Sequence, residues 1–135
     1  MRIEIKVFSA ILSLGVAIST AGVAQQPKHQ VALKGGETAD VANLFWVANC
    51  KSLLTGPIAV EVLEGPPGVT ASVKEQKVIP HKFNCANSVQ GGHLIITAPA
   101  EVKAKTEGTL TVRMKYPTKD GERQGSQSYN VVLFP

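Results

Sequence analysis

A strict alternation of apolar and polar side chains over residues 109–116 is the feature that most restricts how this chain can fold. The apolar positions are Leu110, Val112, Met114 and Tyr116. The polar positions between them are Thr109, Thr111, Arg113 and Lys115. Successive side chains of a β-strand point to opposite faces of its sheet. The segment is therefore predicted to be a strand that buries its apolar register.

A hairpin turn follows this strand. The sequence Lys119-Asp120-Gly121-Glu122 has the composition of a tight turn, in which Gly121 supplies the positive φ that such turns need. The returning segment, residues 127–134, is therefore predicted to pair antiparallel with the strand before the turn.

Shorter segments of the same kind, punctuated by Gly, Pro and Asn, fill the rest of the chain. Predicted strands cover residues 30–34, 40–50, 57–64, 69–74, 77–79 and 93–98, and residues 80–92 are predicted to be mostly loop. Residues 102–108 are the only stretch that could hold a helical turn. Many short strands without an amphipathic helix predict an all-β fold, namely a single antiparallel β-sandwich of seven or eight strands.

The first 24 residues have the pattern of a secretory signal peptide. Arg2 and Lys6 precede an uncharged run over residues 7–23, and the small residues Gly22 and Ala24 stand ahead of Gln25. A membrane anchor is the alternative, but the run is at the lower length limit for crossing a bilayer. We predict a signal peptide over 1–24 and a mature domain over 25–135 that has no transmembrane segment and is periplasmic or secreted.

Cys50 and Cys85 are the two cysteines of the chain. Because an oxidising compartment favours disulfides, the two are predicted to be bonded to each other. A metal site is the alternative, but the closely spaced Cys or His pairs of zinc sites are missing. His81, His93, Cys85 and Met114 have the ligand types of a blue-copper centre, yet Met114 lies inside a regular strand and Cys50 would stay unpaired. No metal or cofactor is predicted.

Neither catalysis nor nucleic-acid binding is predicted from the polar residues. No nucleophile motif of the G-x-S-x-G type occurs, and the acidic pairs Glu61/Glu64 and Asp120/Glu122 are interpreted as solvated surface charges. The net charge of +4 is spread along the chain rather than gathered beside aromatic residues. The chain is predicted not to be an enzyme.

Trp46 is the only tryptophan and stands four residues before Cys50. A single Trp in an apolar strand is most often a core anchor. The alternative is an exposed ring that stacks on a ligand such as a sugar.

Four pieces of the mature chain carry a resemblance to a known kind of protein: residues 45–50 (FWVANC), 62–67 (VLEGPP), 84–99 from Asn84-Cys85 through Gly91-Gly92 to Pro99, and the C-terminal hairpin. Together they resemble the immunoglobulin-like sandwiches of small exported bacterial proteins, in particular a set of short periplasmic proteins without an established activity. The resemblance implies fold and compartment but no activity. Antibody domains place their Trp between the two cysteines, whereas Trp46 precedes both. The bridge is therefore expected to tie a strand end to a loop.

The function expected on these grounds is that of a non-catalytic, monomeric binding domain of the bacterial cell envelope. Its partner would be an unknown protein or envelope polymer, held by the loops at residues 52–56 and 83–92, which the disulfide would bring together. The alternative is a structural subunit resembling fimbrial proteins, which assemble by strand exchange. Phe134 near the C-terminus favours that alternative, whereas residues 25–28 make a poor donor strand. A metal-handling or enzymatic role is the third possibility.

Overall fold

The computed structural model describes residues 29–135, so the predicted signal peptide and its cleavage site lie outside the described residues. Apart from the three-residue 3₁₀ helix η2 (His81–Phe83), the regular structure of this part is all-β, as predicted. Its strands are β1 (His29–Lys34), β2 (Thr38–Leu44), β3 (Val47–Ala48), β4 (Lys51–Ser52), β5 (Ala59–Glu64), β6 (Thr70–Val78), β7 (Val89–Thr97), β8 (Thr106–Thr118) and β9 (Gly121–Phe134).

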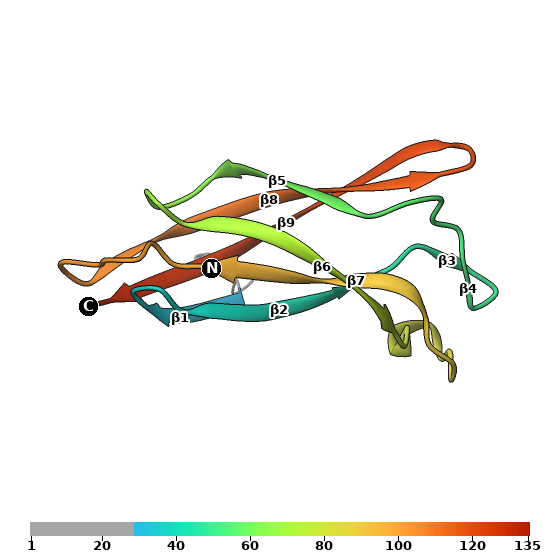
Figure 1. Ribbon diagram of the computed structural model, residues 1–135, viewed down its shortest axis with the longest axis horizontal. Coiled ribbons are helices and arrows are strands. Elements are labelled where there is room, and N and C mark those ends of the chain that lie inside the picture. The colour runs from blue at the N-terminus through green and yellow to red at the C-terminus, as the bar shows by residue number, and fades with distance from the viewer. Residues whose placement is uncertain (1–28) are drawn as a thin grey trace, which may run out of the picture.

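The long strands form two sheets. One has the order β1-β9-β8-β5 and the other the order β2-β7-β6, while β3 and β4 make a separate two-stranded hairpin. The strands run along the long axis of the molecule (Figure 1). The β3–β4 hairpin, the β6–β7 connection and the tip of the β8–β9 hairpin lie at one end, and the C-terminus lies at the other.

The core lies between the two sheets and matches the predicted alternation. Leu110, Val112, Met114 and Tyr116 are all at most 7% exposed. They belong to one hydrophobic cluster with the fully buried Leu94 and Ile96 of the other sheet. Each large apolar side chain buried in this way contributes about 1.5–3 kcal/mol, so this cluster holds the two sheets face to face.

The predicted purely antiparallel arrangement is wrong at β1. This strand runs parallel to β9, in a register from His29 opposite Tyr129 to Lys34 opposite Phe134. Val31 and Leu33 of β1 are buried in the hydrophobic core. The alternation of apolar residues in β1 predicts which face of the strand is buried. It does not predict which strand β1 pairs with or in which direction, because β9 is distant in the sequence.

The segment 40–50, predicted as one strand, is divided. β2 ends at Leu44, Phe45 and Trp46 form a link, and the short strand β3 follows. The segment is apolar in both registers because this link packs at the end of the sandwich rather than within a sheet. With this division, the additional strand β4 and the merging of two predicted strands into β6, residues 29–135 have nine strands instead of the predicted seven or eight.

Two further predictions around β6 and β7 are corrected. The two strands predicted at 69–74 and 77–79 are replaced by the single continuous strand β6 (Thr70–Val78), and β7 begins at Val89, inside the predicted loop 80–92. Gly91 and Gly92 pair with Gln76 and Glu75 of β6. A Cβ on Gly91 would overlap the carbonyl oxygen of Leu44, so this glycine marks a close approach of two backbones and not the end of a strand. Residues 102–108 hold no helical turn and lead into β8.

Candidate functional site

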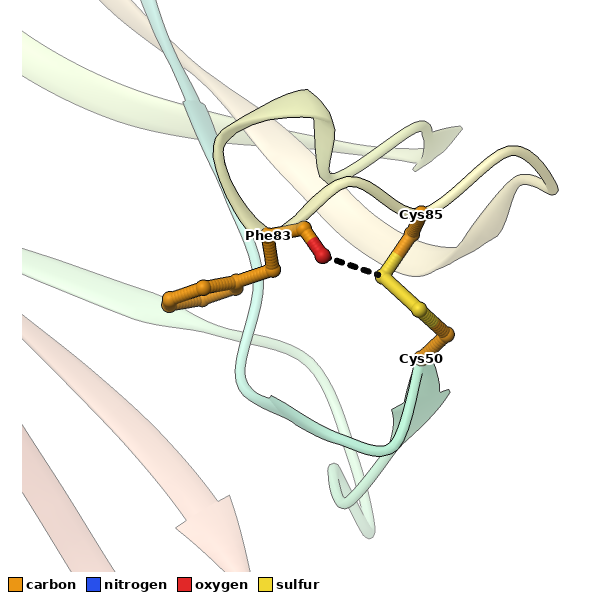
Figure 2. The surroundings of a disulfide bond; sticks show 3 residues. All are labelled: Cys50, Phe83 and Cys85. Atoms are coloured by element: carbon orange, nitrogen blue, oxygen red, sulfur yellow. Dashed lines mark hydrogen bonds between the residues drawn. A yellow bond between two sulfur atoms is a disulfide. The ribbon is translucent and has the colours of Figure 1, made fainter.

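The disulfide lies at the end of the sandwich farthest from the C-terminus (Figures 1 and 2). Cys50 is exposed at the tip of the β3–β4 hairpin, whereas Cys85 is buried in the β6–β7 connection. Their sulfur atoms are 2.09 Å apart and their Cα atoms 5.5 Å apart. The predicted disulfide is therefore present, and it ties a hairpin tip to a loop without crossing the core.

The hairpin turn is made by two residues with left-handed backbone. Asn49 has φ 51° and Cys50 has φ 61°, the combination required by the two central positions of a type I′ turn. Asn is favoured in this conformation, but Cys is not, and a residue held there costs roughly 1–3 kcal/mol. The pairing of Val47 with Ser52 and the bond to Cys85 hold the turn in place.

The β6–β7 connection is organised by one carbonyl group. The Pro80 oxygen accepts hydrogen bonds from the backbone N–H of Phe83 (3.1 Å) and of Cys85 (3.3 Å). Asn84, with φ 59°, reverses the chain between them. The Phe83 carbonyl oxygen lies 3.8 Å from Cys85 Sγ; a disulfide sulfur carries no hydrogen, so this is a close contact rather than a hydrogen bond. Figure 2 shows the Phe83 ring pointing away from the disulfide.

A second link joins the same two regions. Ser52 Oγ donates a hydrogen bond to the Gln90 carbonyl oxygen at 3.3 Å and accepts one from the Leu54 backbone N–H at 3.3 Å. The β3–β4 hairpin is thus connected to residues 83–92 at two points, by the covalent bond from Cys50 and by the hydrogen bond from Ser52.

Four aromatic rings gather at this end. Phe45 and Phe83 meet edge to face with centroids 5.8 Å apart, and Trp46 lies 5.0 Å from Tyr116. Both distances are in the range of favourable aromatic pairs. Phe83 is 55% exposed, while Trp46 is partly buried against the core. Trp46 therefore packs against the core from the β2–β3 link, as the core-anchor interpretation predicts, and its side chain is partly rather than fully buried.

Two hollows flank Trp46, and we name each after one of its residues. The Lys119 hollow has a volume of about 490 Å³ and is lined by Trp46, Ser52, Leu53, Leu54, Thr55, Thr118, Lys119, Asp120 and Arg123. The Phe83 hollow has a volume of about 380 Å³ and is lined by Asn43, Leu44, Phe45, Trp46, Val47, Lys82, Phe83, Tyr116 and Gln127. Trp46 is common to both. We call the two hollows together the disulfide end.

The cations of the Lys119 hollow form no ion pair with described residues. The ion pairs of residues 29–135 join His93 to Asp40 and join Glu61 to Arg113 and Lys115. Lys119 and Arg123 therefore lie more than 4.0 Å from any described carboxylate. In the Phe83 hollow, Lys82 Nζ lies 5.7 Å from the centroid of the Phe83 ring, a cation–π geometry.

Burial affects the two tyrosines. It raises the pKa of Tyr116, which lines the Phe83 hollow. Burial also raises the pKa of Tyr129, and the negative charge of an ionised Tyr116 raises it further. Both phenols are therefore neutral at physiological pH, and the Tyr129 hydroxyl donates to Gln127 Oε1 at 3.0 Å.

The residues weighed for a copper site are not brought together. Met114 is buried in the core, Cys85 is in the disulfide, and His93 lies on β7 with its Nδ1 2.7 Å from Asp40 Oδ2. Across residues 29–135, no three His, Cys, Asp or Glu side chains are grouped so that they could hold a metal ion. The described part also contains no helix with the length and apolar character needed to cross a membrane.

The sequence predicts the two loops of the site but not the contribution of a third segment, the β8–β9 hairpin. Lys119 and Arg123 come from this hairpin, for which the sequence predicts only a turn, and Phe45 is predicted to lie inside a strand. The charged tip of that hairpin, with two cations around Asp120-Gly121-Glu122, was the available signal. Comparison with protein-family models, with curated proteins and with solved structures finds no match for this chain.

Proposed function

We propose that this chain is a non-catalytic, exported binding domain with an immunoglobulin-like sandwich, and that its ligand binds at the disulfide end. One observation carries the proposal. The Cys50–Cys85 bond and the Ser52–Gln90 hydrogen bond fix two distant segments around a pair of hollows that share the partly accessible Trp46. A rigid scaffold that presents such loops is a common architecture for binding sites.

The strand order supports the immunoglobulin-like assignment. The order β2-β7-β6 facing β9-β8-β5 corresponds to the second, fifth and fourth strands of a seven-stranded immunoglobulin sandwich packed on its seventh, sixth and third, once the β3–β4 hairpin is set aside. The first strand departs from the constant-type arrangement, because β1 joins β9 instead of β2.

Two features support export. The N-terminal pattern is that of a signal peptide, and a disulfide persists in the periplasm or outside the cell rather than in the cytosol. An envelope polymer or an envelope protein is therefore the expected partner.

The arrangement of β9 favours a self-contained module over a fimbrial-type subunit. A subunit that exchanges strands leaves one sheet position open for a neighbour's strand. Here β9 is paired along one edge with β1 and along the other with β8. Phe134, which suggested the fimbrial motif, lies opposite Lys34 within this complete sheet. A monomer is the expected state.

The test uses the full chain, expressed for export and purified with its disulfide intact. Because Trp46 is the only tryptophan, its fluorescence reports directly on the disulfide end. The probes are soluble peptidoglycan fragments, a neutral and an acidic oligosaccharide, and a set of unstructured peptides. We expect one class to change the fluorescence and to shift the amide resonances of the two hollows. Binding confined to another face, or self-assembly into polymers, would contradict the proposal.

A further inference from the structure

We infer that the Lys119 hollow binds an acidic oligosaccharide, with a sugar ring against Trp46 and its carboxylate held by Lys119 and Arg123; this rests on the proposed function. The volume of about 490 Å³ is within the range of roughly 300–1,000 Å³ that is usual for ligand sites.

The cations give the first reason. Lys119 and Arg123 of the β8–β9 hairpin line a hollow that has one acidic residue in its lining, Asp120. Neither cation has a described acidic partner within 4.0 Å. A guanidinium binds a carboxylate through two parallel hydrogen bonds, and an ammonium adds a point charge. The hollow therefore has an excess of positive charge available for an anionic group.

The aromatic wall gives the second reason. Trp46 is held by its contact with Tyr116, so its ring loses little freedom when a ligand packs on it. An apolar ring face beside hydrogen-bonding groups suits a sugar, which has apolar C–H faces and a polar rim. Thr55 and the Asp120 carboxylate, both at exposed positions in the same hollow, are available to the sugar hydroxyls.

The backbone around the hollow argues against an added peptide strand. The N–H of Leu53 donates to the Trp46 carbonyl at 2.8 Å, and the N–H of Thr55 donates to the Pro117 carbonyl at 2.9 Å. Leu54 also forms an isolated bridge with Thr118. Strand addition needs a free row of backbone donors and acceptors. Since these groups are already paired with each other, the hollow offers mainly side chains for recognition.

The experiment compares tetragalacturonic acid with maltotetraose, a neutral chain with the same number of sugar units. Binding to the full oxidised chain is followed by Trp46 fluorescence and by calorimetry. We expect the acidic sugar to bind measurably and the neutral one about ten-fold or more weakly, since charge-assisted hydrogen bonds are lost. In the K119Q/R123Q double variant, affinity for the acidic sugar should fall about ten-fold for each charge removed.

The matched control is K74Q/K103Q, which also removes two positive charges but at exposed positions that do not line either hollow. Its affinity should stay within about two-fold of the parent, because distant surface charges are screened by salt.

The results of these experiments separate the acidic-sugar inference from the proposed binding function. Equal binding of the neutral sugar, equal losses in the two double variants, or preferential binding of a peptide at Trp46 would overturn the acidic-sugar inference and leave the proposed binding function standing. If no probe of the full panel perturbs Trp46 or the surrounding resonances, the inference and the proposed function both fail.

Discussion

The hydroxyl of Ser52 donates a hydrogen bond to the backbone carbonyl of Gln90, 38 residues later in the chain, at 3.3 Å. Close to this hydrogen bond in the sequence, the disulfide joins Cys50 to Cys85, which are 35 residues apart. The β3–β4 hairpin, which shares only four residues of regular strand, is therefore held to the sandwich by a covalent and a non-covalent link side by side.

Replacing Ser52 by Ala should cost about 0.5–1.5 kcal/mol in the free energy of unfolding. The loss arises because the Gln90 carbonyl and the Leu54 N–H both lose this side chain as a partner. Urea unfolding followed by circular dichroism measures the change. Ser126→Ala is the control, since this exposed serine of β9 makes no side-chain hydrogen bond that the structure shows. Equal effects of the two substitutions would remove the structural role assigned to Ser52.

Removing the disulfide in a C50A/C85A variant should destabilise the domain by about 3–4 kcal/mol, because the bond closes a long loop in the unfolded chain. Calorimetry should show the unfolding midpoint lowered by roughly 10–20 °C. Reductant should lower the midpoint of the parent by a similar amount and leave that of the variant unchanged. A parent midpoint insensitive to complete reduction would contradict the expectation.

Gly91→Ala and Gly125→Ala form a matched pair of glycine substitutions within strands. The new Cβ at position 91 would overlap the Leu44 carbonyl oxygen, whereas at position 125 its nearest neighbour is a Tyr116 ring carbon at 3.8 Å. We expect Gly91→Ala to cost about 1–3 kcal/mol or more, since backbone must move. Gly125→Ala should be neutral or slightly stabilising. Denaturant midpoints with unchanged slopes measure both effects, and similar midpoints for the two variants would contradict the close approach.

The two tyrosines should make stability fall at alkaline pH. Burial raises the pKa of Tyr116 above its ordinary value of 10.0 and does the same for Tyr129. The native state then keeps protons that the unfolded state has released. The resulting stabilisation is fully present below pH 10 and is lost as the pH rises through the native pKa values. Ultraviolet titration should show phenol ionisation at higher pH in the native chain than in urea. Tyr116→Phe should remove one of the two shifted transitions.

Strands that bury one face could be predicted from the sequence. The β8 register from Leu110 to Tyr116 and the inward face of Val69, Ala71 and Val73 both follow from alternation, because burial on one side imposes a period of two. The alternation stops in the second half of β6, where Glu75, Gln76 and Lys77 are all exposed. That part of the strand is specified by its pairing with β7 and has no local pattern to read.

Of the candidate site, only the disulfide and the two segments beside it could be predicted from the sequence. Two cysteines in a chain that is predicted to be exported indicate a disulfide, and the disulfide predicts that residues 52–56 and 83–92 approach each other. The contribution of Lys119 and Arg123 depends on the length of β8 and β9, which carry their hairpin out to the disulfide end. Gly91-Gly92 was misread because glycine in a sequence signals a turn as readily as a close contact.

The parallel pairing of β1 with β9 has a mechanical consequence. Tension applied to the chain at His29 and at Phe134 pulls these two strands in opposite directions along their shared length, since His29 faces Tyr129 and Lys34 faces Phe134. Their hydrogen bonds are then loaded together in shear, whereas an antiparallel pair pulled from adjacent ends separates one bond at a time. Of the described strands, the first and the last therefore act as a clamp that resists stretching between the two ends of the domain.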